Sequence, residues 1–577
     1  MKRYVAKLVS EALGNMYQNG QIFSLPTFEL EVPKESFGDY TTNVAFAIAR
    51  GGKFNPNEVA EILAREIRLL DQSGFIKEIK VIGGFLNFFM AESALAKLAL
   101  EMQKEIELEK IGYNAAGKPK KVVFEYSSPN TNKPLHIGHT RNDVYGMVCI
   151  NLLRATGYKV ISCEVVNDRG VHIMKSLLMY IKHGAGKTPK SEKIKPDHFV
   201  GKYYAMFGQE AEKNPELEKE AQELLQKWEA GDKEVRKLWK QMNTWFYEGV
   251  QQTYQREGSE FDEVQYESEI YDQGRELVLE GVKKGVFTKE PDGSVAVDLT
   301  DKGLDKKYLL RKDGTTIYIT QDLYLWSLRN KKHHPDLAFV TTSAEQAYHF
   351  AVLAELFKLL GFEWAENFKH LPYEHVYLGK SKMSSRAGNT ITADELLESV
   401  KEKVRQTMRD SQKIKASPED DKTVEAIAFG AIKYGYLKYD RNTKIYFDMD
   451  ETIAIEGNTG PYLQYTFARI QSILEKAGKF KKTAPEALHE PAELNLLRHL
   501  MHYGEYVVLA TKEFRPSLLA NYLYELAAKF NAFYDQVSVL QAESAELKVQ
   551  RLNLLAAVAA VLQHGLELLG IATVKKM

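Results

Sequence analysis

The strongest constraint on the fold is a strand-to-helix turn in the first quarter of the chain. The apolar run 122–124 is typical of a buried strand, and apolar positions between 144 and 153 recur at helical spacing. Between them lies the polar segment SSPNTNKPLHIGHTR, residues 127–141. In an open parallel sheet such a turn lies at the carboxyl edge of the strand, where a helix N-terminus favours anionic ligands. We therefore expect an α/β domain with a ligand site at this turn.

Two histidines occupy the predicted start of the helix. His136 and His139 are three residues apart and would share one face of its first turn. Gly138 between them leaves the backbone open to a flat ligand. A histidine pair at this spacing is also typical of a helix cap or a packed surface, whereas a metal site lacks an obvious third ligand nearby. The spacing alone leaves these alternatives open.

The amino-acid composition excludes few classes of binding partner. The 77 Lys and Arg residues oppose 78 Asp and Glu residues, so phosphate binding requires local patches of cations. Cys149 and Cys163 are too few for a disulfide framework or a cysteine-rich zinc site. The amphipathic N-terminus differs from a signal peptide, and no stretch is as long as a membrane span. We expect a soluble cytoplasmic protein that is a monomer and has no membrane partner.

The length of 577 residues and the changing periodicity predict three regions. An insertion in the second region is indicated by a lysine-rich segment followed by a long charged helical stretch. The regions are an α+β unit at 1–112, an α/β domain at 113–413 with an insertion around 183–310, and an amphipathic helical bundle at 414–577.

A second unusual segment follows a predicted strand late in the α/β region. Residues 379–392 read GKSKMSSRAGNTIT and combine lysines, an arginine and small hydroxylated residues. Such a loop can surround a polyphosphate, although alone it is more often simply solvated. Its pairing with the histidine segment favours a shared phosphate site.

The two segments together resemble the HIGH and KMSKS signatures of class I aminoacyl-tRNA synthetases. Further segments resemble the arginyl-tRNA synthetase family in particular: EYSSPNTNKPLHIGHTR, VVNDRG, YITQDL, SAEQAYHF, KMSSRAG, EGNTGPYLQYTFARI and the N-terminal FGDYTTN. This resemblance implies a multidomain α/β protein. Its expected parts are a Rossmann-type class I catalytic domain, an α+β N-terminal domain that contacts tRNA and an all-helical anticodon-binding domain.

The implied reaction is the ATP-dependent ligation of L-arginine to tRNA(Arg) through arginyl-adenylate. His136 and His139 would donate N–H bonds to phosphate oxygens, and Lys382 would hold the departing pyrophosphate. Ser385 stands where the class I signature usually has a second lysine, so Lys133 is the apparent substitute. Mg²⁺ would bridge the phosphates without a dedicated protein site. The implied ATP contacts are His136, Gly138, His139, Lys382, Met383, Ser384, Ser385 and Arg386.

Recognition of arginine requires anions and planar acceptors, because a guanidinium has five donors and keeps its charge. By resemblance, the arginine-binding residues are Glu125, Asn130, Tyr318, Asp322 and Gln346. The implied tRNA contacts are Phe85, Asn87, Tyr462, Tyr465, Arg469, Tyr534 and Met577, whose aromatic members can stack on unpaired bases.

Three other functions are compatible with part of the pattern. The first is another class I aminoacyl-tRNA synthetase, such as the cysteinyl enzyme, but the cysteinyl enzyme would require a zinc-binding cysteine cluster, which two cysteines cannot provide. A small nucleotidyltransferase would not need the long helical C-terminal region. A non-catalytic tRNA-binding paralogue would not need intact HIGH and KMSS residues.

Overall fold

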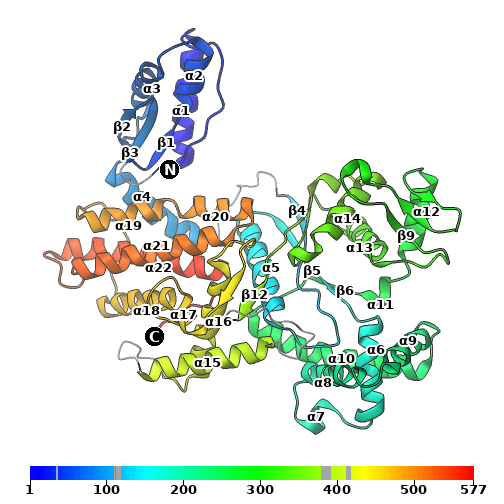
Figure 1. Cartoon of the computed structure of the whole chain (residues 1–577). Coiled ribbons are helices and arrows are strands. Elements are labelled where there is room, and N and C mark those ends of the chain that lie inside the picture. Colours follow the sequence, from blue (N-terminus) through cyan, green and yellow to red (C-terminus); the bar gives the residue numbers. More distant parts are fainter. Residues whose placement is uncertain (34–36, 109–110, 112–118, 379–390, 411–416) are drawn as a thin grey trace. The chain divides into compact units, whose positions relative to one another are not determined.

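The computed structural model describes residues 1–33, 37–108, 111, 119–378, 391–410 and 417–577 (Figure 1). They form two compact units. The first consists of Met1–Ile111, Thr466–Tyr506 and Tyr522–His564, and the second of Gly112–Tyr465, Val507–Asn521 and Gly565–Met577. No helix among the described residues is long and apolar enough to cross a membrane.

The first unit combines a small α+β sheet with helices. Among its described strands, β1, β3 and β2 form an antiparallel sheet in that order, and α1 and α3 pack together. The elements wholly within it are α1 (Lys2–Gln18), β1 (Tyr40–Thr42), α2 (Val44–Gly52), α3 (Pro56–Leu70), β2 (Ile76–Ile82), β3 (Phe85–Met90), α4 (Glu92–Glu107) and α19 (Pro491–Met501). Four helices belong partly to each unit: α18 (Gly460–Ala477), α20 (Tyr503–Glu513), α21 (Pro516–Gln536) and α22 (Ala545–Leu568).

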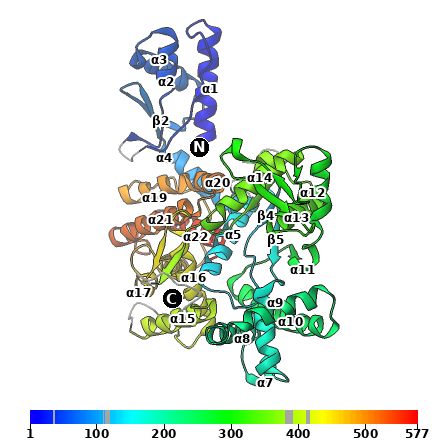
Figure 2. The ribbon, with the colours of Figure 1, turned by 45° about the vertical axis from the view of Figure 1, so that its right-hand side comes forward.

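The second unit contains the predicted α/β fold, which Figure 2 shows from a second direction. Its elements up to α12 are β4 (Lys121–Glu125), α5 (Ile137–Ala155), β5 (Lys159–Val166), α6 (Val171–Met179), η2 (Tyr180–Gly184), α7 (Pro189–Glu192), α8 (Pro196–Ala211), α9 (Glu216–Glu229), α10 (Lys233–Glu257), β6 (Glu263–Tyr266), α11 (Glu267–Ile270) and α12 (Gly274–Lys283). The later elements are β7 (Thr288–Lys289), β8 (Val295–Val297), η3 (Thr300–Lys302), β9 (Lys307–Leu310), α13 (Tyr318–His333), β10 (Leu337–Val340), η4 (Ala344–Gln346), α14 (Ala347–Leu360), η5 (Ala365–Asn367), β11 (Phe368–His370), β12 (Val376–Leu378), α15 (Ala393–Asp410), α16 (Asp421–Leu437), β13 (Ile445–Phe447) and α17 (Met449–Thr452).

The central sheet is wholly parallel within the described chain. Its order is β11-β10-β4-β5-β6, so the first strand in sequence lies in the middle. From β4 the chain continues to β5 on one side and reaches β10 on the other much later. The direction in which strands are added to the sheet thus reverses at β4, and open parallel sheets bind ligands at the carboxyl edge beside such a reversal. Strand β6 belongs to this sheet although it falls within the expected insertion at 183–310. That interval therefore contains part of the central sheet, because β6 returns to pair with β5 after α10.

Helix α5 is held closely against the end of β4. A Cβ atom added to Gly146 would lie 2.5 Å from Cβ and 2.6 Å from Cγ of Tyr126, so glycine permits this contact. In the next turn toward the N-terminus, the buried guanidinium of Arg141 donates hydrogen bonds to the carbonyls of Glu374, Arg441 and Thr443. The start of α5 is consequently fixed both to the sheet and to the chain around β12.

The first prediction concerns this contact. Gly146→Ala forces a methyl group into the Tyr126 side chain, so it should lower the free energy of unfolding by about 1 to 3 kcal/mol. Gly208→Ala on α8 is the matched control, because a Cβ there meets nothing within 4 Å and alanine favours a helix. Chemical denaturation of both variants checks the prediction. Equal stability of the two would contradict the close α5–β4 contact.

Candidate active site

The HIGH segment forms the first turn of α5 at the carboxyl edge of β4. His136 is the N-cap, and its Nδ1 accepts the N–H of Gly138 at 3.1 Å. Nδ1 of His139 accepts the N–H of His136, also at 3.1 Å. A neutral imidazole that accepts at Nδ1 carries its proton on Nε2. Both histidines therefore present an Nε2–H donor, and their ring centroids lie 3.9 Å apart.

Burial keeps these rings neutral. Desolvation lowers the pKa of His136 to about 4, with a smaller contribution from the ammonium of Lys133. Desolvation also lowers the pKa of His139 well below its usual value, assisted by the charges of His136 and Lys133. The same cause lowers the pKa of Lys133 itself. The first turn of α5 thus provides neutral N–H donors beside an ammonium, an arrangement suited to phosphate oxygens.

The turn before HIGH has a strained backbone. Ser127 and Ser128 adopt left-handed φ angles of 70° and 64°, which L-residues other than Gly, Asn and Asp rarely occupy. Side-chain amides hold both carbonyls: Asn142 Nδ2 donates to Ser127 O and Asn167 Nδ2 to Ser128 O, each at 3.2 Å. Ser127 Oγ also lies 2.7 Å from the hydroxyl of the buried Tyr254. Residues from α5, α10 and the segment after β5 therefore determine the path of the chain into HIGH.

Asn130 lies beside the NDRG segment that follows β5. It forms a parallel bridge with Asn167, and the flanking Thr131 donates its N–H to Asn167 O at 3.2 Å. The loops after β4 and β5 are therefore joined at the carboxyl edge of the sheet. This joint places Asn130 at the edge where the other predicted arginine-binding residues gather.

Three predicted arginine-binding residues follow β9 and β10. Tyr318 begins α13 and is 69% exposed, while Asp322 lies one turn further along the same helix. Asp322 Oδ2 lies 2.6 Å from Nε2 of His349 on α14. Gln346 is exposed at the end of η4, three residues before His349. The structure thus brings Asp322 close to the helix that follows Gln346.

Glu125, the last residue of β4, is engaged in an internal ion pair. The carboxylate pairs with the buried guanidinium of Arg329 on α13, and Arg329 also donates to Gln265 Oε1 at 2.9 Å. Its negative charge is therefore already compensated from within the protein. Glu125 can still accept a hydrogen bond from a ligand amine, but it supplies less net charge than an unpaired carboxylate would.

Sequence reasoning missed two charged residues of this region. Glu267, which begins α11 directly after β6, is buried and interacts electrostatically with Asp322 and Tyr318. Burial raises its pKa to about 7, partly offset by Arg169. Arg329 is the other. Only their positions in the sequence could have indicated these two residues: Glu267 directly follows the strand pattern of β6, and Arg329 lies seven residues after Asp322.

Lys133 lies just before HIGH and packs against α8. A Cβ added to Gly201 of α8 would approach Cδ of Pro134 at 2.5 Å and Cα of Lys133 at 3.6 Å. Lys133 is half-buried. The predicted partners Lys382, Met383, Ser384, Ser385 and Arg386 lie outside the described residues.

The predicted tRNA-binding residues are distributed over both units. In the first unit, Phe85 is 42% exposed on β3, whereas Asn87 is buried and donates to Lys80 O. Also there, the Arg469 guanidinium lies 5.2 Å above the ring of Tyr534 and donates to Asn531 Oδ1 at 3.0 Å. Tyr462 and Tyr465 on α18 and the buried Met577 belong to the second unit.

One group of described residues has the composition of a metal site. Asp197, His198 and Asp394 place one ligand atom each within 4.8 Å of one another. However, the Lys195 ammonium lies 2.7 Å from Asp394 Oδ2 and 3.4 Å from Asp197 Oδ2. An ammonium already holds these oxygens, so the group is better described as an ion-pair cluster than as a metal centre.

Comparison with known proteins identifies the family. The family model "tRNA synthetases class I (R), catalytic domain" matches residues 102–449, "DALR anticodon binding domain" matches 463–577, and "Arginyl tRNA synthetase N terminal domain" matches 3–90. The arginine–tRNA ligase of Bacteroides thetaiotaomicron is 38% identical over 596 aligned residues that cover 99% of each chain. The chain belongs to the arginyl-tRNA synthetase family.

Two further comparisons agree with this membership. The arginine–tRNA ligase of Treponema denticola is 40% identical and covers 93% of this chain and 92% of its own. The solved arginyl-tRNA synthetase of Thermus thermophilus superposes with a TM-score of 0.85 at 25% identity, covering all of both chains. The predicted fold class, a class I catalytic domain with an α+β N-terminal domain and a helical C-terminal domain, is thereby confirmed. The alternative of a cysteinyl enzyme is not favoured.

The second prediction concerns protonation at HIGH. The folded His136 ring has a lower pKa than the ordinary 6.5, so it binds a proton less readily than the unfolded ring. The stability that depends on the neutral ring is therefore complete above about pH 6.5 and is lost as the pH falls toward 4.

Nitrogen NMR of ¹⁵N-histidine-labelled protein, assigned with a His136→Asn variant, should find His136 neutral with its proton on Nε2 at pH 5. A ring that titrates near pH 6.5, or one protonated on Nδ1, would contradict the hydrogen bonds of the first turn.

Proposed function

We propose that this chain attaches L-arginine to tRNA(Arg) in two steps, through an arginyl-adenylate formed from ATP. One observation carries the proposal. At the carboxyl edge of β4, two neutral Nε2–H donors lie on a segment that is joined through Asn130 and Asn167 to the neighbouring loop. Carboxylates follow other strands of the same sheet, with Glu267 directly after β6. One edge of the sheet therefore carries both N–H groups that can donate to phosphate oxygens and carboxylates that can accept hydrogen bonds from a cation.

In the first step the arginine carboxylate attacks the α-phosphorus of ATP. A new bond forms between the carboxylate oxygen and the α-phosphorus. The bond between the α-phosphorus and the α–β bridging oxygen breaks, and pyrophosphate leaves with its electron pair. The Nε2–H groups of His136 and His139 would donate to the phosphate oxygens on which charge develops. Because both rings are fixed by their own backbone, these donors need little reorganisation during the reaction.

Cations would compensate the charge of the departing pyrophosphate. We assign Lys133 to this role from the HIGH side, together with Lys382 and Arg386 from the second signature. The two HIGH imidazoles offer N–H donors, whereas Mg²⁺ prefers oxygen ligands. A Mg²⁺ ion would accordingly be held by the ATP phosphates and water, and it would supply further charge compensation to them.

Arginine would be recognised by acceptors grouped around α13. Asp322 and Glu267 would face the guanidinium with Tyr318, and Glu125, Asn130 and Gln346 would hold the α-amino end. Glu267 is an addition to the residues suggested by resemblance. It is supported by its position directly after β6 and by its like-charge repulsion with Asp322, which a bound cation would relieve. A pocket built on hydrogen bonds rejects ligands that lack the matching donors, because its buried acceptors would remain unpaired.

In the second step a terminal ribose hydroxyl of the tRNA attacks the adenylate carbonyl, and AMP leaves. We assign anticodon recognition to Tyr462, Tyr465, Arg469 and Tyr534, with Met577 at the chain end. Phe85 and Asn87 would contact the body of the tRNA. The exposure of Phe85 and Tyr534 is compatible with base stacking, whereas the buried Asn87 would act through the shape of β3.

The third prediction tests the substrate. In a panel of twenty amino acids with total tRNA, the protein should charge arginine alone. Asp322→Asn removes a negative charge opposite the guanidinium, and it should weaken arginine binding by about 2 to 5 kcal/mol while ATP binding survives. Asp336→Asn is the matched control, because Asp336 binds the backbone of Lys121 at the opposite, amino edge of the sheet. Charging of another amino acid would refute the function, and unchanged arginine affinity in Asp322→Asn would refute the residue assignment.

The fourth prediction tests the cation beside HIGH. Lys133→Ala should slow adenylate formation by roughly 10² to 10³, the effect typical of losing one preorganised transition-state donor. The affinity for arginine should change little. Ser385→Lys should partly restore the rate, because it returns a cation at the position of the usual signature lysine.

Single-turnover adenylate formation with saturating tRNA measures both variants. An unaffected Lys133→Ala enzyme would refute the role of Lys133 and transfer it to Arg386 or the metal.

A further inference from the structure

The residues that follow KMSS are attached directly to HIGH. Thr392 forms an antiparallel bridge with His136, and Ala393 donates its N–H to Leu135 O at 2.8 Å. Ile137 donates its N–H to Ile391 O at 3.4 Å. Lys382 precedes Ile391 by nine residues in the sequence. Residues 391–393 are therefore held against the backbone that begins α5.

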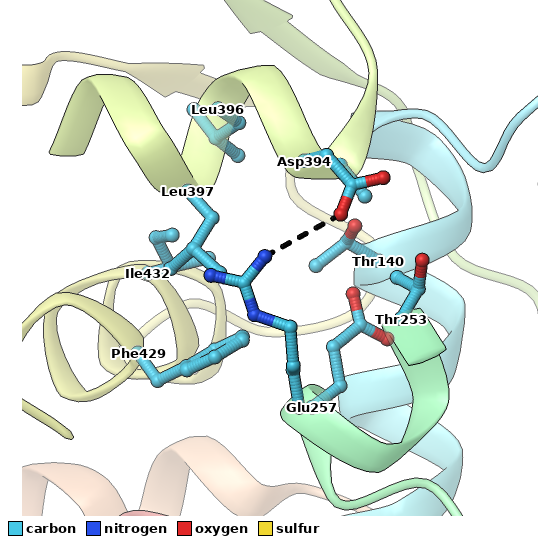
Figure 3. A pocket seen from close by; sticks show the side chains of 10 residues that line it. Thr140, Thr253, Glu257, Asp394, Leu396, Leu397, Phe429 and Ile432 are labelled. Atoms are coloured by element: carbon cyan, nitrogen blue, oxygen red, sulfur yellow. Dashed lines mark ion pairs between the residues drawn. The ribbon is translucent and has the colours of Figure 1, made fainter. Parts of the chain in front are cut away.

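Asp394 holds this attachment from its other side. It is the second residue of α15, and its Oδ2 accepts hydrogen bonds from Lys195 Nζ at 2.7 Å and His198 Nε2 at 3.0 Å. Its Oδ1 lies 3.6 Å from the guanidinium of Arg256 at the end of α10, which Figure 3 marks with a dashed line. Burial would raise the pKa of Asp394, but the hydrogen bonds from His198 and Lys195 lower it to about 2. One carboxylate thus joins α15 to both α8 and α10.

Arg256 extends the attachment along α15. It forms two hydrogen bonds of 3.0 Å to Glu425 on α16 and one of 2.7 Å to Glu398, one turn beyond Asp394. Figure 3 shows Asp394 directed into the same small pocket as Thr140 of α5 and Glu257 of α10. The first turn of α15 is therefore packed against the helix that begins with HIGH.

Helix α8 contacts the segment before HIGH and also holds Asp394, which follows KMSS in the sequence. Its Gly201 permits close contact with the backbone at Lys133 and Pro134. One turn earlier, His198 holds Asp394 with the help of Lys195, which precedes the helix. Because His198 and Gly201 lie three residues apart on one rigid helix, the segment before HIGH and the segment after KMSS have a fixed separation.

We propose that Asp394 is a positioning residue for the adenylation step. Its ion pairs with Lys195, His198 and Arg256 hold residues 391–393 against the backbone of Leu135, His136 and Ile137. They thereby fix the first turn of α5, whose Nε2–H groups are the proposed donors to the phosphates of ATP. Removing its charge would take away the acceptor that Lys195 and His198 share next to the positive N-terminal end of α15, which would weaken the attachment although Asp197, Glu398 and Glu425 remain. The inference rests on the proposed function of this site.

The test compares Asp394→Asn with the wild-type enzyme in ATP–pyrophosphate exchange at saturating tRNA. We expect a higher KM for ATP and a lower exchange rate, together roughly 10- to 100-fold in kcat/KM, the range expected when reacting groups are slightly misplaced. The KM for arginine should stay within about twofold, because the arginine residues lie on other elements. Asp394→Glu, which keeps the charge, should recover part of the loss.

Glu398→Gln is the matched control. It removes another ion pair of Arg256 but leaves the contacts of Asp394 with Lys195 and His198, so ATP kinetics should remain unchanged. Thermal unfolding of each variant ensures that the assays compare folded protein. If Asp394→Asn does not fold, His198→Ala replaces it, and a raised KM for ATP alone supports the inference.

The inference is overturned if the tested variant keeps its ATP kinetics, if the KM for arginine rises by the same factor, or if Glu398→Gln has an equal effect. A wild-type protein that fails to charge arginine would instead refute the proposed function.

Discussion

The active-site architecture depends on how the first turn of α5 uses its two histidines. Each Nδ1 accepts a backbone N–H, so each ring caps the helix and fixes its own tautomer at the same time. The preceding serines adopt left-handed backbone angles, and Asn142 and Asn167 hold the carbonyls of these serines. A cap and a phosphate donor are alternatives when the sequence is considered alone, but an imidazole that caps through Nδ1 still carries the Nε2–H that we propose as the phosphate donor.

The negative charge available at the proposed arginine site is lower than a count of its carboxylates suggests. Arg329 already neutralises Glu125, so an incoming guanidinium would depend mainly on Asp322 and Glu267. Glu267 has a pKa of about 7, raised by burial, and is only partly ionised near neutral pH. A bound cation would favour its ionised form, so arginine binding in this pocket would release protons.

The strand and helix that carry HIGH could be predicted from the sequence, because their patterns are local. The apolar run at 122–124 predicted β4, and the helical spacing after Thr140 predicted α5 with HIGH at its start. The partners that complete the site are distant in sequence and have no pattern of their own. Arg329 lies 204 residues from Glu125 and Asp394 lies 199 residues from Lys195, and both pairings follow from how strands and helices pack. The predicted insertion around 183–310 included β6 for the same reason, since nothing local marks β6 as the outer strand of the central sheet.

The sheet order also has a consequence for synthesis on the ribosome. Strand β4 is central, yet β10 on one of its sides is made about two hundred residues later, near the Arg329 that pairs with Glu125. At 5 to 20 residues per second, β4 waits roughly 10 to 40 s for that neighbour. During this interval one edge of β4 lacks its neighbouring strand, and the carboxylate of Glu125 lacks its partner Arg329. The half-finished sheet therefore exposes an unpaired strand edge during synthesis, whereas the small antiparallel sheet of residues 40–90 can close as soon as it emerges.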